Sequence, residues 1–205
     1  HGASGYGLSA LLSGRPFIVT VYGSELLHGR GKTYLAMVRA IFRAARAITV
    51  TSRTARDRVI QLCPTLADKT HLFHTGDDLG KLALVADAVP EKHEHKLVQL
   101  MCIRNCASHY RTVEVLDALR TIVADVAPFR VIVPLGNGDP DYFARLRRDY
   151  PDPWIQYIDD IIPNEAFLTL MRNVDICVNF PLSDQTSATL LEALYLDRVI
   201  VTCNL

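Results

Sequence analysis

Short apolar runs rich in β-branched residues alternate with helical segments along the whole chain. This alternation predicts βαβ units and therefore parallel sheets. Near-continuous apolar strands are typical of sheets that are covered on both faces. The fold class predicted from the sequence is thus α/β. The expected strands cover residues 17–23, 47–51, 71–74, 97–103, 129–135, 154–158, 175–180 and 198–202.

The polar segment 83–96 interrupts this pattern and carries Pro90 among charged residues, which predicts a linker. We therefore expect a first lobe over residues 1–82 and a second lobe over residues 97–205. A chain of 205 residues is long enough for two small lobes. The chain begins in a glycine-rich loop and stops on a core strand, so both lobes are expected to be incomplete.

Three polar residues are expected to begin helices of these lobes. Ser52 precedes the expected helix 53–62, and Asn164 precedes another at 165–173. Asp139 is followed by Pro140, a residue favoured at the first helical position. Each helix start therefore lies shortly after an expected strand.

Charge and cysteine content exclude several classes of function. The chain has 22 basic and 22 acidic residues, whereas general nucleic-acid binding normally needs a basic surface. Its five cysteines are scattered and mostly apolar in context, which predicts buried free thiols in a reducing compartment. Cys102 and Cys106 have no second cysteine pair nearby, so no zinc site is expected. The absence of a signal peptide or a long apolar span predicts a cytoplasmic protein, with the inner face of the cell membrane as an alternative.

Two carboxylates, Asp184 and Glu192, flank the turn between the expected strand 175–180 and the helix 187–196. Open α/β sheets bind ligands in the crevice past the carboxyl ends of their strands. Carboxylates there can accept hydrogen bonds from sugar hydroxyls or stabilise positive charge that develops at a sugar carbon. The alternative is an ordinary solvated loop acid and a surface helix acid.

A glycine turn, Gly136-Asn137-Gly138, follows the expected strand 129–135. It lacks the third glycine of the dinucleotide-binding fingerprint, so NAD binding is not supported.

Six segments in order carry a resemblance to a known family. They are Pro16 to Leu26, Ala47 to Ser52, Thr75 to Leu79, Gly136 to Gly138, Val174 to Val178, and Asp184 to Ala193. Together they resemble the middle of a GT-B retaining glycosyltransferase of the family-4 type (glycosyl transferases group 1). The arrangement Asp184-Gln185-x-Ser187 is similar to a subgroup found in bacterial surface-polysaccharide synthesis. The resemblance implies two Rossmann-like lobes, an acceptor-side lobe followed by a donor-binding lobe.

The resemblance implies that a nucleotide-diphosphate sugar of the UDP or GDP type binds to the second lobe. Asp184 would contact the transferred sugar and Glu192 the ribose hydroxyls. Backbone N–H groups at the helix start would hold the diphosphate, and a helix N-terminus favours anions for independent physical reasons. The residues implied at that helix start are Thr186, Ser187 and Ala188.

Other implied donor contacts lie after earlier strands. Arg104 matches a phosphate-gripping arginine, a role that suits a guanidinium. The lysine usually found a few residues later is missing, and His109 or Arg111 stands in its region. The Gly136 turn and the backbone around Ile161 would lie near the diphosphate and the base.

The sequence departs from the family at two positions near the reacting sugar. Tyr22 replaces the usual histidine, which removes the charge switch of an imidazole. Asp184 is one methylene shorter than the usual glutamate.

The resemblance therefore predicts a retaining transfer of sugar to a glycan or lipid-linked acceptor in polysaccharide biosynthesis, without a cofactor or a bound metal. A GT-B-like nucleotide-sugar epimerase and a non-catalytic nucleotide-binding fragment remain as alternatives.

Three arginines, Arg39, Arg43 and Arg46, repeat at helical spacing beside apolar residues. Such a basic amphipathic helix can lie against an anionic membrane. The alternative is a solvated basic face on a helix that packs on the core.

Overall fold

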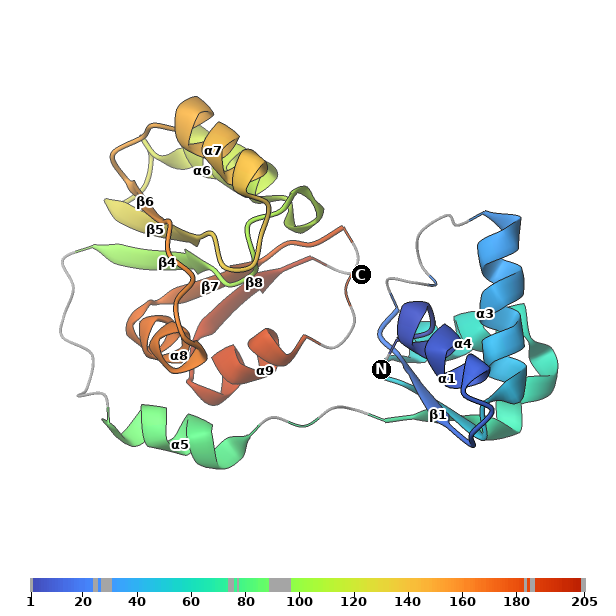
Figure 1. Ribbon diagram of the computed structural model, residues 1–205. Coiled ribbons are helices and arrows are strands. Elements are labelled where there is room, and N and C mark those ends of the chain that lie inside the picture. Colours follow the sequence, from blue (N-terminus) through green and yellow to red (C-terminus); the bar gives the residue numbers. More distant parts are fainter. Residues whose placement is uncertain are drawn as a thin grey trace. The chain divides into compact units, whose positions relative to one another are not determined.

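The computed structural model describes residues 2–23, 26, 31–73, 76, 78–88, 97–182, 184 and 187–203. The chain forms two compact units (Figure 1), one of residues 1–76 and 183–186 and one of residues 77–182 and 187–205. Both are α/β units with parallel sheets, as predicted. No helix in the described part of the chain is long and apolar enough to cross a membrane.

The first unit has a three-stranded sheet in the order β1-β2-β3. Val21 at the end of β1 lies opposite Val50 at the end of β2, so these strands finish at one edge. The largest fully buried side chains of its core include Phe42 and Ile41 of α3 and Ile48 of β2. Its elements are α1 (Gly5–Leu12), β1 (Ile18–Val21), α3 (Lys32–Ala44), β2 (Ala47–Val50), α4 (Arg53–Leu62), the 3-10 helix Pro64–Lys69 and β3 (Thr70–Leu72).

The second unit has a five-stranded sheet in the order β6-β5-β4-β7-β8. Helices α6 and α7 cover one face of the sheet, and α8 and α9 cover the other, with α5 packed against α8 (Figure 1). A buried apolar cluster lies on each face. Its elements are α5 (Leu79–Ala88), β4 (Val98–Cys102), the 3-10 helix Ser108–Tyr110, α6 (Thr112–Ile122), β5 (Phe129–Pro134), α7 (Pro140–Asp149), β6 (Ile155–Ile158), α8 (Asn164–Asn173), β7 (Ile176–Asn179), α9 (Ala188–Tyr195) and β8 (Val199–Thr202).

The predicted linker 83–96 is wrong for residues 83–88, which belong to α5. Asp78 precedes this helix and caps its N-terminus, because its carboxylate accepts a hydrogen bond of 3.1 Å from the backbone N–H of Lys81. Leu82 and Val85 are buried in the core of the second unit. The boundary between the units therefore falls after Gly76, not after residue 82. Residues 89–96 lie outside the described part.

Two of the three predicted helix caps are confirmed. Ser52 accepts a hydrogen bond from the N–H of Ala55, and Asp139 accepts from those of Asp141 and Tyr142. The cap predicted at Asn164 is wrong, because Asn164 is the first residue of α8 and Pro163 precedes it as the cap residue. The side chain of Asn164 instead accepts a hydrogen bond from Lys81 on α5.

Candidate functional site

The strand order of the second unit reverses between β4 and β7. The chain runs outward from β4 through β5 to β6, and then crosses to β7 on the other side of β4. The loops after β4 and β7 therefore diverge at the carboxyl edge of the sheet. Open parallel sheets bind ligands at such a switch point.

A cleft of about 400 Å³ opens at this edge, within the second unit. Its walls come from the loops after β4, β5 and β6 and from the first turns of α8 and α9. The lining residues are Ile103, Arg104, Asn105, Pro134, Gly136, Asn137, Ile161, Ile162, Asn164, Phe167, Ala188, Thr189 and Glu192.

Arg104 follows β4, and its guanidinium is held by at least two neighbours in the described part of the chain. One nitrogen, Nη1, donates a hydrogen bond of 2.5 Å to the Oγ of Ser187. The other, Nη2, donates to the hydroxyl of Tyr110 at 3.0 Å, and the guanidinium also lies 4.6 Å from the centre of that ring. A second contact, from the N–H of Leu182 to the carbonyl of His109, also joins the loops after β4 and β7. A cation is thereby fixed at the switch point.

Ser187 is the residue before α9 and is buried, but its side chain does not cap the helix. Its hydroxyl accepts the hydrogen bond from Arg104 instead. The first backbone N–H groups of α9 thus have no side-chain cap, and Ala188 and Thr189 line the cleft. Uncapped N–H groups and the helix dipole together favour an anion at this position.

Glu192 lies one turn further along α9, four residues after Ala188 and so about 6 Å along the helix axis. It is partly buried and lines the same cleft. The cleft therefore offers a cation and free backbone donors at one point and a carboxylate one turn away.

The two glycines of the Gly136-Asn137-Gly138 turn are required for different reasons. Gly136 has a φ of +57°, which other residues rarely adopt. A Cβ on Gly138 would lie 2.2 Å from the carbonyl oxygen of Cys106. The turn is locked against the loop after β4, because the N–H of Asp139 donates to that same oxygen at 2.8 Å. The backbones after β4 and β5 therefore meet at the floor of the cleft.

The opposite wall of the cleft is apolar. Ile161 and Ile162 come from the loop after β6, and Phe167 from α8. Ile161 is 66% exposed, so an apolar surface is available to a ligand there.

The structure brings together five of the predicted donor-binding residues, Arg104, Gly136, Ile161, Ala188 and Glu192, in this one cleft. Ser187 lies behind them in contact with Arg104.

The other predicted site residues lie elsewhere or are not described. His109 and Arg111 are absent from the described lining; Arg111 pairs with Glu114 at 3.1 Å and lies over the ring of Phe180. Tyr22 directly follows β1 in the first unit. Asp184 is partly buried and also absent from the lining. Thr186 lies outside the described residues.

Several lining residues were not among the site residues predicted from the sequence, and they include Asn105, Asn137 and Phe167. The Oδ1 of Asn105 accepts from the N–H of Asn137 at 3.3 Å, which helps to shape the turn. For Asn105 and Asn137 the available signal was their position in loops after β4 and β5, since polar residues in loops have no periodicity, whereas Phe167 lies within α8.

The cysteines near the sheet are buried free thiols, as predicted, although Cys203 is partly exposed. Burial raises the pKa of Cys102 and of Cys177 to about 12. These thiols are therefore neutral and unreactive at physiological pH. Among the described residues, no group of three or more histidine, cysteine or acidic side chains is placed to hold a metal ion.

The predicted membrane-contact arginines lie on and just after α3. Arg39 donates from Nε to the carbonyl oxygen of Leu62 at 3.3 Å, whereas Arg43 and Arg46 are exposed.

Solved structures of the same fold confirm the predicted architecture. HepE from Anabaena, solved with UDP and glucose, superposes with a TM-score of 0.74 at 13% identity over 96% of this chain and 55% of that one. A UDP-forming trehalose-phosphate synthase from Burkholderia xenovorans gives 0.71 at 12% identity, over 95% of this chain and 55% of that one. The fold is of the GT-B glycosyltransferase type.

A further neighbour, the trehalose-6-phosphate synthase OtsA, gives a TM-score of 0.67 at 11% identity, over 83% of this chain and 48% of that one. The chain thus spans about half the length of these GT-B structures. No protein-family model and no curated protein sequence matches it.

Proposed function

We propose that the second unit binds a nucleotide-diphosphate sugar of the UDP type, and that the protein is a glycosyltransferase that uses it as donor. One observation carries this proposal. Arg104 and the uncapped start of α9 converge at the switch point of the sheet, with Glu192 one turn further along the same cleft. The GT-B fold supports it, as do neighbours solved with UDP-glucose and with UDP.

The diphosphate is assigned to the side of the cleft with Arg104. A guanidinium and several backbone N–H groups can together neutralise two phosphate groups. In a transfer reaction the same groups would stabilise the charge that develops on the leaving nucleoside diphosphate. Arg104 is held by Ser187 and Tyr110 before any ligand arrives, so little reorganisation is needed.

The nucleoside is assigned to the remainder of the cleft. Glu192 would accept hydrogen bonds from the two ribose hydroxyls. The exposed face of Ile161 and the backbone beside it would receive the base. The cleft volume of about 400 Å³ lies within the range of small-molecule sites.

We further propose that Asp184 contacts the transferred sugar and that Tyr22 lies near the reacting centre. Backbone N–H groups at Thr186 would assist at the diphosphate, and His109 and Arg111 would support it from the loop after β4. Retention at the anomeric carbon is part of the proposal. It is supported by a structural neighbour, a trehalose-6-phosphate synthase, described as transferring glycosyl groups with retention.

The proposed acceptor is a glycan or a lipid-linked saccharide in polysaccharide biosynthesis. We propose that the reaction needs the nucleotide sugar as donor substrate and no separate cofactor. Contact with a membrane through Arg39, Arg43 and Arg46 stays a prediction, and the exposure of the last two is compatible with it.

A nucleotide panel tests the donor site directly. The chain would be titrated calorimetrically with UDP, GDP, ADP and CMP. The proposal expects UDP to bind more tightly than CMP, because a diphosphate can reach both Arg104 and the helix start whereas a monophosphate cannot. Equal binding of all four, or none, would contradict it.

A further inference from the structure

The chain is neutral as a whole, but its two parts carry large net charges of opposite sign. Residues 1–76 contain ten lysines and arginines against three acidic residues, a net charge of +7. Residues 77–205 contain twelve against nineteen, a net charge of −7. The first unit is therefore a strongly basic body, and a field of that size attracts and orients anionic ligands.

Among the described residues of the first unit, no lysine or arginine forms an ion pair with an acidic residue. All four ion pairs between described residues lie in the second unit. In the described part of the first unit, the lysines and arginines that make hydrogen bonds donate to neutral groups. Arg39 donates to a carbonyl oxygen, Lys69 to two, and Arg58 to the side chain of Gln61. The charge thus remains available to a partner.

Two of these cations lie at the carboxyl edge of the first sheet. Val21, Val50 and Leu72 are the last residues of their strands, and Val50 is paired with both of the others. The chain leaves β2 through Ser52, which caps α4 by accepting from the N–H of Ala55. Arg53 is consequently the first residue of α4, with Arg56 one turn further.

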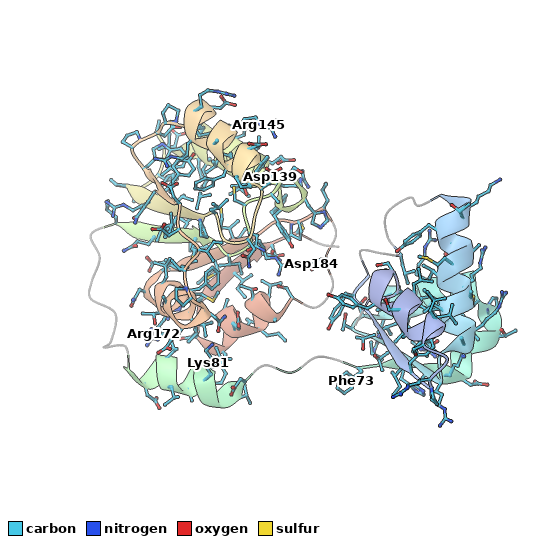
Figure 2. All side chains as sticks on the ribbon, in the orientation of Figure 1. Phe73, Lys81, Asp139, Arg145, Arg172 and Asp184 are labelled. Carbon is cyan, nitrogen blue, oxygen red and sulfur yellow. The ribbon has the colours of Figure 1, made fainter. Side chains whose placement is uncertain are left out.

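Three exposed aromatic rings belong to the same edge. Tyr22 follows β1 and is 43% exposed. Phe73, labelled in Figure 2, follows β3, and it is 59% exposed. Tyr6 is 79% exposed on the first turn of α1. Gly2 connects Tyr6 to this edge. The N–H of Gly2 donates a hydrogen bond to the carbonyl of Thr20 in β1. Gly2 also lies beside the Tyr6 ring, because a Cβ added to Gly2 would be 4.0 Å from Cδ2 of Tyr6.

Exposed aromatic rings beside unpaired arginines suit one kind of ligand. The faces of such rings pack against the apolar faces of sugars, and a guanidinium binds a carboxylate or phosphate in a bidentate manner. We propose that the carboxyl edge of the first sheet binds an acidic saccharide, with Tyr6, Tyr22 and Phe73 against its rings and Arg53 and Arg56 on its acidic groups. If the proposed function holds, this saccharide is the acceptor of the transferred sugar.

An anionic membrane surface is the alternative partner for a basic unit. A membrane and an acidic saccharide would depend on different arginines of this unit. An anionic bilayer responds to total charge, so Arg43 and Arg46 at the amino end of the sheet would count as much as Arg53 and Arg56. An acidic saccharide requires the cations that lie beside the aromatic rings. The two pairs of arginines therefore provide a matched comparison.

The experiment measures binding by the whole chain, without turnover. The probes are hexagalacturonate for carboxylate, mannose 6-phosphate for phosphate, maltohexaose as a neutral oligosaccharide, and vesicles of phosphatidylglycerol. UDP is titrated in parallel. The variants are the pair R53Q/R56Q and the control pair R43Q/R46Q, with circular dichroism to show that each is folded.

We expect one or both acidic saccharides to bind, maltohexaose to bind much more weakly, and the affinity to fall in about 0.5 M salt. R53Q/R56Q should lower the affinity about tenfold or more, and R43Q/R46Q by less than about twofold. Equal loss in both pairs, equal binding of maltohexaose, or binding of the vesicles alone would overturn the inference. If UDP binds and neither acidic saccharide does, this inference fails while the donor site stands. Failure of UDP alone would instead contradict the proposed function.

Discussion

The guanidinium of Arg104 and the hydroxyl of Ser187 are joined by a hydrogen bond of 2.5 Å across the switch point of the second sheet. This contact has two consequences. It fixes the direction of the only arginine in the described cleft lining, and it removes the serine hydroxyl from its usual role as a helix cap. The cation and the free N–H groups of α9 are therefore presented to the same ligand.

Removing the serine hydroxyl tests this relationship. S187A should weaken UDP binding about fivefold to twentyfold, because a hydrogen bond to a charged group contributes about 1.5 kcal/mol. The stability of the chain should change little, since that hydroxyl does not cap α9. Y110F removes the other hydrogen bond to the guanidinium but keeps the ring beside it, and should weaken UDP binding by a similar factor or less. A loss of stability in S187A with unchanged UDP affinity would contradict the assignment.

Glu192 is expected to hold the ribose through charge-assisted hydrogen bonds. E192Q should weaken UDP binding about tenfold, which corresponds to about 1.4 kcal/mol. Glu165 is an exposed acid on α8 outside the cleft lining, so E165Q serves as the control and should bind UDP normally. Calorimetric titration checks both. Similar affinities for the two variants would exclude Glu192 from the site.

The close approach at Gly138 makes a strong prediction about stability. In G138A the new Cβ would meet the Cys106 backbone at 2.2 Å, so the turn and the loop after β4 must separate. We expect a loss of about 2–3 kcal/mol in the free energy of unfolding, measured with urea. Gly5 lies in α1 with no atom within 4 Å of an added Cβ, so G5A should be neutral or slightly stabilising. Equal effects would show that the approach is not as close as described.

The assignment of residues 79–88 to a helix of the second unit is tested by its buried face. Leu82 is 2% exposed, so L82A should cost about 2–4 kcal/mol in the free energy of unfolding. Leu84 is 71% exposed on the same helix, and L84A should change it by less than about 0.5 kcal/mol. If both changes prove equally harmless, this segment is a linker after all.

The buried thiols predict a loss of stability in alkali. The pKa of Cys102 and of Cys177 is about 12 in the folded chain and near 9 when the thiol is exposed. Their contribution is complete below pH 9 and declines as the pH rises toward 12, since only the unfolded chain releases the protons. Each thiol should lower the free energy of unfolding by up to about 1.4 kcal/mol per pH unit in this range.

Urea unfolding at pH 8 and pH 10 measures this slope. The variant C102A/C177A removes both thiols. Its free energy of unfolding should fall less between pH 8 and pH 10 than that of the unchanged chain, whatever its stability at pH 8. An unchanged slope would mean that these thiols are accessible to solvent.

Local rules predicted much of the fold because the relevant signals lie close together in the sequence. The strand 47–51 and the helix 53–62 were predicted nearly as observed, since an apolar run, a capping serine and a proline follow one another. The helix α5 was missed because only Leu82 and Val85 form its buried face and a polar, proline-containing stretch follows directly. Its stability comes from packing on α8, which has no local signal.

Some residues of the candidate site could likewise be predicted from the sequence, whereas others depend on contacts with distant parts of the chain. Arg104 and Glu192 could be proposed because their surroundings resemble segments of known glycosyltransferases, with Arg104 directly after an expected strand and Glu192 within an expected helix. The need for glycine at position 138 could not be foreseen, because it arises from the Cys106 backbone, which comes from a different loop. The role of Ser187 likewise depends on a partner 83 residues away in the chain.

Hydrogen exchange of the whole chain with and without UDP tests the central claim most directly. We predict that UDP slows exchange after β4 around Arg104, at the Gly136 turn and in the first turn of α9, and leaves the outer helix α7 unchanged. Protection confined to the small pocket between α6 and α7, beside Tyr142 and Tyr150, or no protection at saturating UDP, would contradict the assignment of the donor site.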